Sequence, residues 1–496
     1  MVEYKRINTY KIFFLVLWII GSIFAAVNHE IWRDEMRALS IVIDNTNIWN
    51  LVSDLKNEGH PILWYLILKA AYFIYPHSVV LKIVSWIVGL FSVLILMRYS
   101  KLPRWLVILY SFSIILFWEN TIMCRNYGIS SLLIFIFLYL YRSGRLYWII
   151  LVLALLIQTN VLSVVIAWLL FLISIFYKQE YLRWTPQKII AGVSLLLIST
   201  YLFYFTTAPD STSIIISIKE RNILDMMASG IKSIIIPDKL FKSFIGEIAI
   251  FNFLIAFFML WSLISKRFLA VSFWFLIGIT QFVYTEIYAL YTRHLGVVFS
   301  FFIVLLDLGK VYSKKWQPTF SDTLQKFSLF VATPLFFMGM VVSTIIHVWR
   351  DFKLPATSNK ELASFIEANP KYKNSILMAD SDFIIEGLPY YLDNPIFIPR
   401  ENCFRKFVHF TTKNKNEIST SELLRFASTD SIKKLGPVLF VCSCKFEPKG
   451  DTLYKYQNYS QLKVMFHCPE DLKRINKLKV FNTSFEDENY TLYELN

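Results

Sequence analysis

The sequence predicts a polytopic α-helical membrane protein of about eleven transmembrane helices, with a C-terminal α/β domain outside the cytosol. Three observations lead to this fold class. Of the 496 residues, 56% are hydrophobic and only 17% are charged, whereas about 25% are charged in a typical soluble domain. Uncharged apolar runs recur throughout residues 1–349. From residue 350 onward, the composition becomes mixed and resembles that of a soluble domain.

The predicted spans follow from the apolar runs, because a helix needs about 20 residues to cross the hydrocarbon core. The first run has a basic start but a poor cleavage site, so we expect it to be retained as a span. The run 146–177 is too long for one helix, and its polar triplet 158–160 divides it into two. The runs then give eleven spans: 12–27, 83–97, 105–118, 126–141, 146–177 (two), 189–209, 248–265, 268–285, 295–306 and 327–349.

The distribution of charge predicts the orientation of the spans. Residues 1–349 carry 29 Lys and Arg against 17 Asp and Glu, whereas residues 350–496 carry 21 against 19. Because this positive excess lies between apolar runs, it is typical of cytosolic linkers and not of nucleic-acid binding. The basic linkers all lie on the cytosolic side if the N-terminus is cytosolic and segment 61–76 does not cross the membrane. We therefore expect 61–76 to form an amphipathic or re-entrant helix in an outer loop, 28–78.

Residues 350–496 are predicted to form a small soluble domain. Short β-rich runs at 375–380, 395–399, 437–444 and 462–468 alternate with polar stretches, and 358–370 has the pattern of a capped helix. Outside the cytosol, its four cysteines could form disulfides; unpaired thiols are the alternative. These cysteines are Cys403, Cys442, Cys444 and Cys468.

The first outer loop is rich in acidic residues, since segment 28–60 carries six acids and three bases. Asp34 and Glu35 are adjacent, so they do not face each other on a helix, and we expect one to act as a general base and the other to have a structural or substrate-orienting role. Arg33 and Arg37 would keep these acids ionised. A solvated loop of mixed charge is the alternative.

Further ionisable residues fall at outer boundaries of the predicted spans. Arg125, Arg293 and His294 are candidates for binding a lipid phosphate, since guanidinium groups match phosphate oxygens well. Snorkelling of these side chains to lipid headgroups is the alternative. The predicted topology places them on the same side of the membrane as Asp34. The residues expected to line the same outer cavity, or to contact an acceptor there, are Glu58, His60, Glu119 and Glu286.

Together these features resemble the GT-C superfamily of membrane glycosyltransferases, in particular the bacterial group related to protein O-mannosyltransferases and the lipid A aminoarabinose transferase. The resemblance rests on "RDE" (33–35), "EGHPILWYLILKAAYFIY" (58–75) and "CRNYG" (124–128). It implies transfer of a hexose or pentose from a polyprenyl-phosphate carrier to a lipid, glycan or protein acceptor on the outer face. It also implies that Asp34 is the catalytic base, with Glu35 as its acidic neighbour.

The same resemblance implies that Arg125 and Arg293 bind the donor phosphate. We expect no cofactor; a divalent metal is left open, but no ligand cluster indicates one. The sequence has no glycine-rich nucleotide loop and no G-x-S-x-G motif, so neither nucleotide-driven pumping nor hydrolase chemistry is indicated. A transporter or flippase of lipid-linked glycan intermediates is the alternative function. The expected location is a bacterial inner or plasma membrane, with the N-terminus in the cytoplasm.

Overall fold

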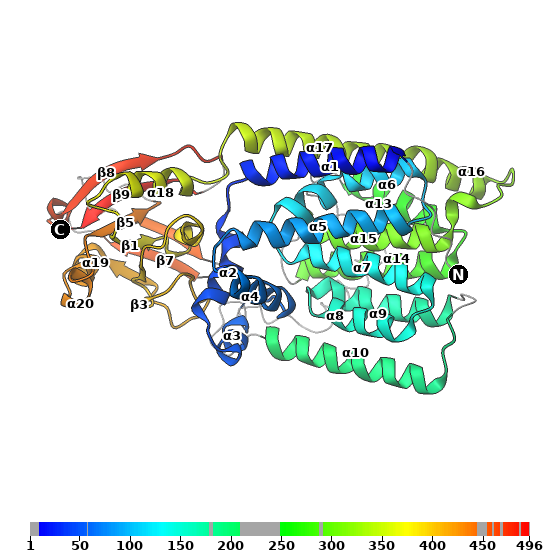
Figure 1. Cartoon of the computed structure of the whole chain (residues 1–496), viewed down its shortest axis with the longest axis horizontal. Coiled ribbons are helices and arrows are strands. Elements are labelled where there is room, and N and C mark those ends of the chain that lie inside the picture. Colours follow the sequence, from blue (N-terminus) through cyan, green and yellow to red (C-terminus); the bar gives the residue numbers. More distant parts are fainter. Residues whose placement is uncertain are drawn as a thin grey trace.

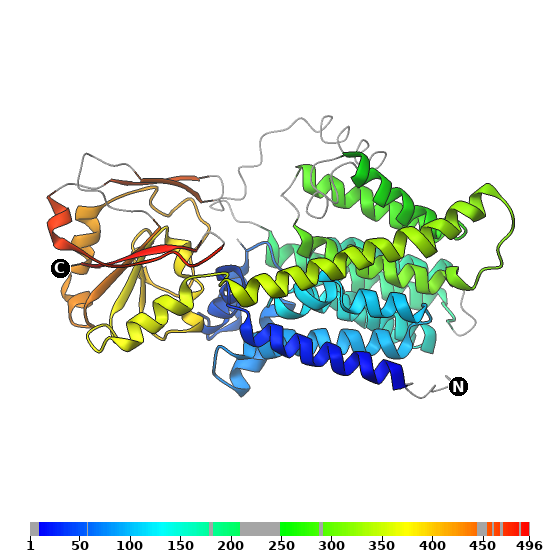
Figure 2. The same cartoon turned by 90° about the horizontal axis from the view of Figure 1, so that it is seen from above.

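The computed structural model describes residues 9–56, 58–177, 182–208, 249–286, 291–443, 454–458, 461–466, 470–485 and 488–495. Within these residues a bundle of apolar helices is followed by a mixed α/β domain at one end (Figures 1 and 2). The bundle helices are α1 (Thr9–Asn28), α5 (Val80–Tyr99), α6 (Arg104–Ser111), η1 (Ile114–Ile122), α7 (Tyr127–Ser143), α8 (Leu146–Ile157), α9 (Val161–Phe176), α10 (Pro186–Thr207), α13 (Ala249–Leu263), α14 (Arg267–Glu286), α15 (Thr292–Gly309), η3 (Val311–Ser313), α16 (Phe320–Phe327), η4 (Ser328–Ala332) and α17 (Thr333–Lys353).

Each apolar run that predicted a span forms a helix or a pair of helices. Six helical segments in the described residues are long and apolar enough to cross a membrane, and the bent pair of α6 and η1 makes a seventh. Several other apolar helices, such as α7 and α9, are shorter. The structure therefore supports a polytopic helical membrane protein, while the number of eleven crossings stays a prediction.

The predicted break in the longest apolar run is confirmed. Helix α8 ends at Ile157 and α9 begins at Val161. The side chain of Asn160 caps α9 by accepting a hydrogen bond from the backbone N–H of Ser163 at 2.9 Å. The polar triplet therefore ends one helix and starts the next.

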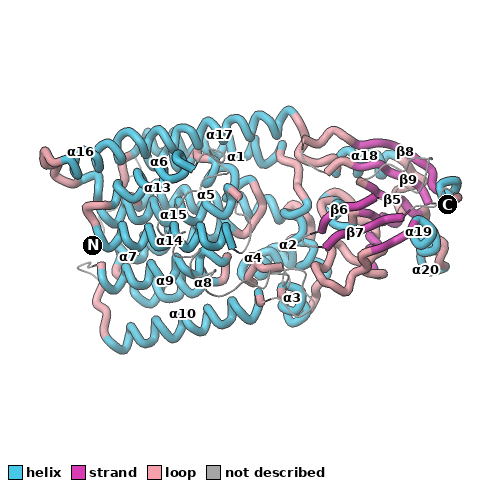
Figure 3. The backbone as a smooth tube through the Cα atoms, turned by 180° about the vertical axis from the view of Figure 1, so that it is seen from behind, coloured by secondary structure: helices cyan, strands magenta, loops and turns pink. Residues whose placement is uncertain are grey.

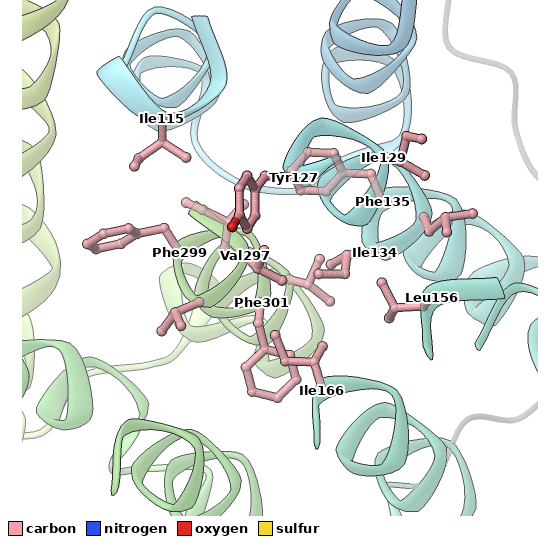
Figure 4. Close-up of a cluster of buried hydrophobic side chains, with 14 of the residues drawn as sticks. Ile115, Tyr127, Ile129, Ile134, Phe135, Leu156, Ile166, Val297, Phe299 and Phe301 are labelled. Atoms are coloured by element: carbon pink, nitrogen blue, oxygen red, sulfur yellow. The ribbon is translucent and has the colours of Figure 1, made fainter. Parts of the chain in front are cut away.

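Helix α15 lies at the centre of the bundle. Its residues from His294 to Gly309 are all buried, which is the pattern of a helix surrounded by other helices. Figure 4 shows Val297, Phe299 and Phe301 of α15 among apolar side chains from several neighbouring helices. The N-terminal end of this central helix carries Arg293, so the packing of α15 positions that arginine.

The first outer loop is more ordered than the sequence predicted. It contains two helices, α2 (Arg33–Asp44) and α3 (Ile48–Leu55). They are short and amphipathic, and α2 buries polar as well as apolar side chains. The predicted interfacial helix is present as α4 (Leu63–Ile74). Figure 3 shows α2, α3 and α4 between the bundle and the C-terminal domain.

The C-terminal domain is built on a six-stranded mixed sheet of order β3-β2-β1-β5-β9-β8. Strands β1, β2 and β5 are parallel, and a second sheet of three strands has the order β4-β7-β6. The predicted β-rich runs correspond to β1, β2, β5 and β7, and the predicted helix to α18. The elements of the domain are α18 (Asn359–Ala368), β1 (Ile376–Asp380), η5 (Asp382–Ile385), η6 (Leu388–Tyr390), β2 (Ile396–Ile398), β3 (Cys403–Phe404), β4 (Glu417–Ser419), α19 (Thr420–Ala427), α20 (Asp430–Lys433), β5 (Val438–Cys442), β6 (Tyr454–Asn458), β7 (Gln461–Phe466), η7 (Asp471–Arg474), β8 (Ile475–Phe481) and β9 (Tyr490–Leu495).

The connection between the two parts is helical, because α17 continues past residue 349 to Lys353. Helix α1 begins at the end of the bundle away from the C-terminal domain (Figure 1). In the C-terminal domain Cys442 is disulfide-bonded, whereas Cys403 is free. Cys444 and Cys468 lie outside the described residues.

Candidate functional site

A cavity opens where α2, α4 and the start of α7 meet the C-terminal domain. It encloses about 530 Å³, part of it open to solvent. The lining residues are Asp34, Arg37, Ala38, Glu58, His60, Trp64, Tyr65, Cys124, Arg125, Asn126 and Phe410.

Asp34 is in the first turn of α2, where the helix N-terminus favours a carboxylate. Its Oδ2 accepts a hydrogen bond from Nη1 of Arg125 at 2.5 Å. Nη2 of Arg293, at the start of α15, lies 3.7 Å from the same oxygen. The structure thus brings together three residues that the sequence predicted to lie on one side of the membrane. The side chain of Asp34 stays 31% exposed, so the carboxylate is reachable.

The arginines control the charge of Asp34. Burial alone would raise the pKa of Asp34, but the guanidinium groups of Arg125, Arg293 and Arg33 outweigh it and lower the pKa to about 2. The carboxylate is therefore ionised at neutral pH. Because both neighbouring guanidiniums stabilise the anion, it is also a weak base while these ion pairs last.

Glu35 has a different environment from its neighbour. It is completely buried and is not among the residues that line the described cavity. Its Oε1 accepts the backbone N–H of Cys124 at 2.7 Å, and its Oε2 accepts that of Trp32 at 2.9 Å. One carboxylate thereby joins the turn that carries Arg125 to the turn that carries Asp34.

His29 completes this arrangement, and sequence reasoning missed it. Its Nε2 lies 3.0 Å from Oε2 of Glu35, and its Nδ1 lies 2.9 Å from Oδ2 of Asp351 in α17. Burial would lower the pKa of His29, but Glu35 and Asp351 raise it to about 10. A charged imidazolium between two buried carboxylates therefore links α2 to α17. The distant partner, Asp351, gave no local signal in the sequence.

The side chains of Arg293 and His294 have different contacts. The Arg293 guanidinium lies 4.8 Å from the ring centre of Tyr291 and 5.9 Å from that of Trp32. In the described part of the chain, the buried Nε of Arg293 and Nε1 of Trp32 have no hydrogen-bond acceptor. His294 is buried, and its Nδ1 accepts the backbone N–H of Tyr291 at 2.8 Å, which caps α15.

Glu58 and His60 line the cavity, as the sequence predicted. Both oxygens of Glu58 accept hydrogen bonds from Arg37, at 2.6 and 2.8 Å. Burial, together with the charges of Arg125 and Arg293, lowers the pKa of His60 to about 3, so the imidazole is neutral. His60 is therefore a neutral hydrogen-bonding group in the wall.

Of the two remaining candidates, Glu119 is not among the lining residues of this cavity. Glu119 lies within η1, on the bundle side of the Arg125 turn. Glu286 is the last residue of α14, and its side chain lies outside the described part of the structure. Glu119 therefore does not line this cavity, while the position predicted for Glu286 stays a prediction.

No family model and no curated protein sequence matches this chain. Among solved structures, the chain is similar to the crystal structure of ArnT from Cupriavidus metallidurans bound to undecaprenyl phosphate. The match covers 92% of this chain and 97% of that chain, with a TM-score of 0.48 and 12% sequence identity.

Proposed function

We propose that this protein is an integral membrane glycosyltransferase that transfers a sugar from a polyprenyl-phosphate carrier to an acceptor hydroxyl on the extracytoplasmic face. The observation that carries the proposal is the convergence of Asp34, Arg125 and Arg293 at one end of an apolar helix bundle. It combines a proton acceptor with an anion-binding group. The apolar bundle and the surrounding bilayer suit a polyprenyl chain.

The donor phosphate is proposed to bind Arg125 and Arg293. Both guanidiniums lie within 4 Å of the Asp34 carboxylate, at 2.5 Å for Arg125 and 3.7 Å for Arg293. Buried donors normally have acceptors, and two nearby buried donors, Nε of Arg293 and Nε1 of Trp32, have none among the described residues. Phosphate oxygens would satisfy such donors.

The proposed reaction is a direct displacement at the anomeric carbon. Asp34 accepts the proton of the acceptor hydroxyl while that oxygen bonds to the sugar carbon. The bond from this carbon to the phosphate oxygen breaks, and its electron pair leaves with the lipid phosphate. Arg125 and Arg293 stabilise the departing charge. A bound phosphate also draws these guanidiniums from Asp34, which raises the pKa of Asp34 from about 2 and strengthens the base.

Glu35 is proposed to position Asp34 and not to exchange protons with substrate. Its oxygens are occupied by His29 and by two backbone N–H groups. Different roles for Asp34 and Glu35 agree with the expectation from their adjacent positions in the sequence. Glu58 and His60 are proposed to form the wall of the substrate cavity.

The extracytoplasmic location of the site is supported by three features. The basic linkers predict that the opposite end of the bundle is cytosolic. The site and the C-terminal domain share the other end (Figure 1). Cys442 in that domain is disulfide-bonded, as is typical of oxidising compartments.

The test is sugar transfer by the full chain in nanodiscs. Undecaprenyl-phosphate sugars from the source membranes serve as donors, and extracted envelope material provides acceptors; release of undecaprenyl phosphate is measured. We expect Asp34→Asn to lower transfer by about 100-fold or more, and Asp393→Asn, at an exposed position of the C-terminal domain, to keep it. Full transfer by a folded Asp34→Asn variant would overturn the proposal. Movement of an intact lipid-linked sugar without release of undecaprenyl phosphate would favour a flippase.

A further inference from the structure

The C-terminal domain contributes a side chain to the cavity. Phe410 is the one lining residue, among those described, that lies beyond α17. It faces a cavity that also contains Asp34 and Arg125. Only 6% of Phe410 is exposed. The soluble domain is therefore part of the cavity wall.

Residues 406–409, just before Phe410, are attached to the membrane half by specific contacts. The backbone N–H of Lys406 donates to Oδ2 of Asp44 at 2.8 Å. The carbonyl of Val408 accepts from Nη2 of Arg37 at 2.6 Å. His409 Nε2 lies 3.2 Å from Oδ1 of Asp54. These contacts reach α2 and α3, so the loop is docked on the helix that carries Asp34 and on its neighbour.

The ring of Phe410 is also held from one face. The guanidinium carbon of Arg37 lies 3.9 Å from the ring centre, which is a cation–π contact. Arg37 itself pairs with Glu58 of the membrane half and with Glu386 of the C-terminal domain. Because Arg37 has several partners, it keeps the ring in place against the cavity.

The chemistry of the cavity wall suits a sugar ring. Trp64, Tyr65 and Phe410 supply aromatic surface, and Asp34, His60 and Asn126 supply polar groups. Nε1 of Trp64 is buried and has no acceptor among the described residues. A polyprenyl chain would leave such donors unsatisfied, at a substantial cost in free energy. A polyhydroxylated ring can satisfy them while its C–H faces pack on the aromatic side chains.

We propose that Phe410 is a specificity-determining residue, through which the C-terminal domain closes a subsite for the transferred monosaccharide beside Asp34 and Arg125. The proposal rests on the glycosyltransferase function proposed above. Phe410 sets the size of sugar that the subsite accepts. The phosphate binds the two arginines and the lipid chain does not enter the sugar subsite, so the binding of both is insensitive to the Phe410 side chain.

The experiment compares three synthetic donors, undecaprenyl phosphate linked to a pentose, a hexose or an N-acetylhexosamine. The kcat/KM for release of undecaprenyl phosphate is measured for each donor. We expect Phe410→Ala to shift the preference toward the largest accepted sugar by about tenfold or more, because small changes in pocket size have effects of this order. Phe410→Leu keeps more of the packing, so it should shift the sugar preference less than Phe410→Ala does. The matched control is Phe404→Ala, at an exposed position on β3.

Binding of undecaprenyl phosphate without a sugar separates this proposal from the function on which it rests. Wild type, Phe410→Ala and Phe410→Leu should bind it equally. Unchanged sugar preference in both variants, with transfer retained, would overturn the role of Phe410 while leaving the glycosyltransferase intact. Wild-type protein that binds the lipid phosphate no better than Arg125→Ala would overturn both proposals.

Discussion

Asp34 and Arg125 are 91 residues apart in the chain, and their side chains meet at 2.5 Å. Beside them, Glu35 and His29 form a second, fully buried pair. The two pairs differ in exposure. The first lies at a cavity and can exchange its partners with a ligand, whereas the second is enclosed and holds backbone N–H groups. We therefore expect the first pair to determine activity and the second to determine stability.

Arg125→Ala is expected to weaken binding of undecaprenyl phosphate by about 10- to 100-fold, the usual value of a hydrogen bond to a charged group. Arg125→Lys keeps the charge but loses the planar fork, so its affinity should be intermediate. Titration of the purified variants with the lipid measures both effects. Arg425→Ala, at an exposed position in α19, is the control. Equal affinities for all three variants would exclude Arg125 from the phosphate site.

His29→Asn is expected to lower the free energy of unfolding by about 3–5 kcal/mol, because it leaves Glu35 and Asp351 buried without their cation. The folded-state pKa of about 10 lies above the unfolded value. The stability that His29 contributes is therefore complete below about pH 6.5 and is lost as the pH rises toward 10. Thermal unfolding measured from pH 6 to pH 10 tests this. The difference in stability between wild type and His29→Asn should narrow as the pH rises. A difference in stability that stays constant with pH would contradict a charged His29 between Glu35 and Asp351.

At the scale of elements, the position of Arg125 depends on how closely α7 approaches η1. Gly128 permits this close approach, because a Cβ at this position would lie 2.4 Å from the carbonyl oxygen of Asn120. The turn between these two helices carries Arg125, and Glu35 accepts a hydrogen bond from the same turn. Close backbone packing in the bundle therefore sets the geometry at the cavity.

Gly128→Ala is expected to destabilise the protein by about 1–3 kcal/mol, because a helix must shift to accommodate the methyl group. It should also lower transfer, since the Arg125 turn moves with α7. The control is Gly339→Ala in α17, where a Cβ would meet no atom within 4 Å; this change should be neutral or stabilising. The two midpoints of thermal unfolding provide the comparison. Equal midpoints for the two variants would mean that the packing of α7 against η1 leaves room for a methyl group at residue 128.

The apolar runs predicted most elements correctly, because membrane helices and buried strands are both marked by local composition. The break at 158–160 is an example, since Asn160 has a capping pattern visible in the sequence. Helices α2 and α3 were read as loop because both are short and because α2 buries charged and polar residues. The cap at Asn47 was the available local signal for α3.

The candidate site was only partly predictable. Asp34, Arg125 and Arg293 were found because topology places their segments at one membrane face. His29, Asp351 and Phe410 were missed, since their importance arises from contacts between distant parts of the chain. For Glu35 the sequence allowed a structural role beside the general base, and the contacts of Glu35 with two buried backbone N–H groups are of that kind.

At the scale of the whole molecule, the bundle and the C-terminal domain are joined by buried ion pairs as well as by α17. Arg37 pairs with Glu386, and Arg33 lies 3.4 Å from Glu488. Burial raises the pKa of Glu386 to about 7 despite the nearby Arg37. Such charges are costly to bury unless they are paired, so the docked arrangement depends on complementary partners.

Arg37→Ala is expected to loosen the C-terminal domain, because it leaves Glu58 and Glu386 buried without a cation and frees the Phe410 loop. Limited proteolysis should cleave the segment after α17, residues 354–358, at least about tenfold faster. Arg425→Ala, an exposed change in the same domain, should leave the rate unchanged. Cleavage of both variants at the wild-type rate would show that Arg37 does not hold the domain.

Asp34 and a lipid phosphate would share the same two guanidiniums, and this competition can be measured directly. The measurement is the affinity of purified Asp34→Asn for undecaprenyl phosphate, alongside its transfer activity. Removal of the competing carboxylate should tighten lipid binding, by about fivefold at most for a partly exposed ion pair, while transfer is lost. Lipid binding that is no tighter than in wild type, or transfer that persists, would contradict the shared site.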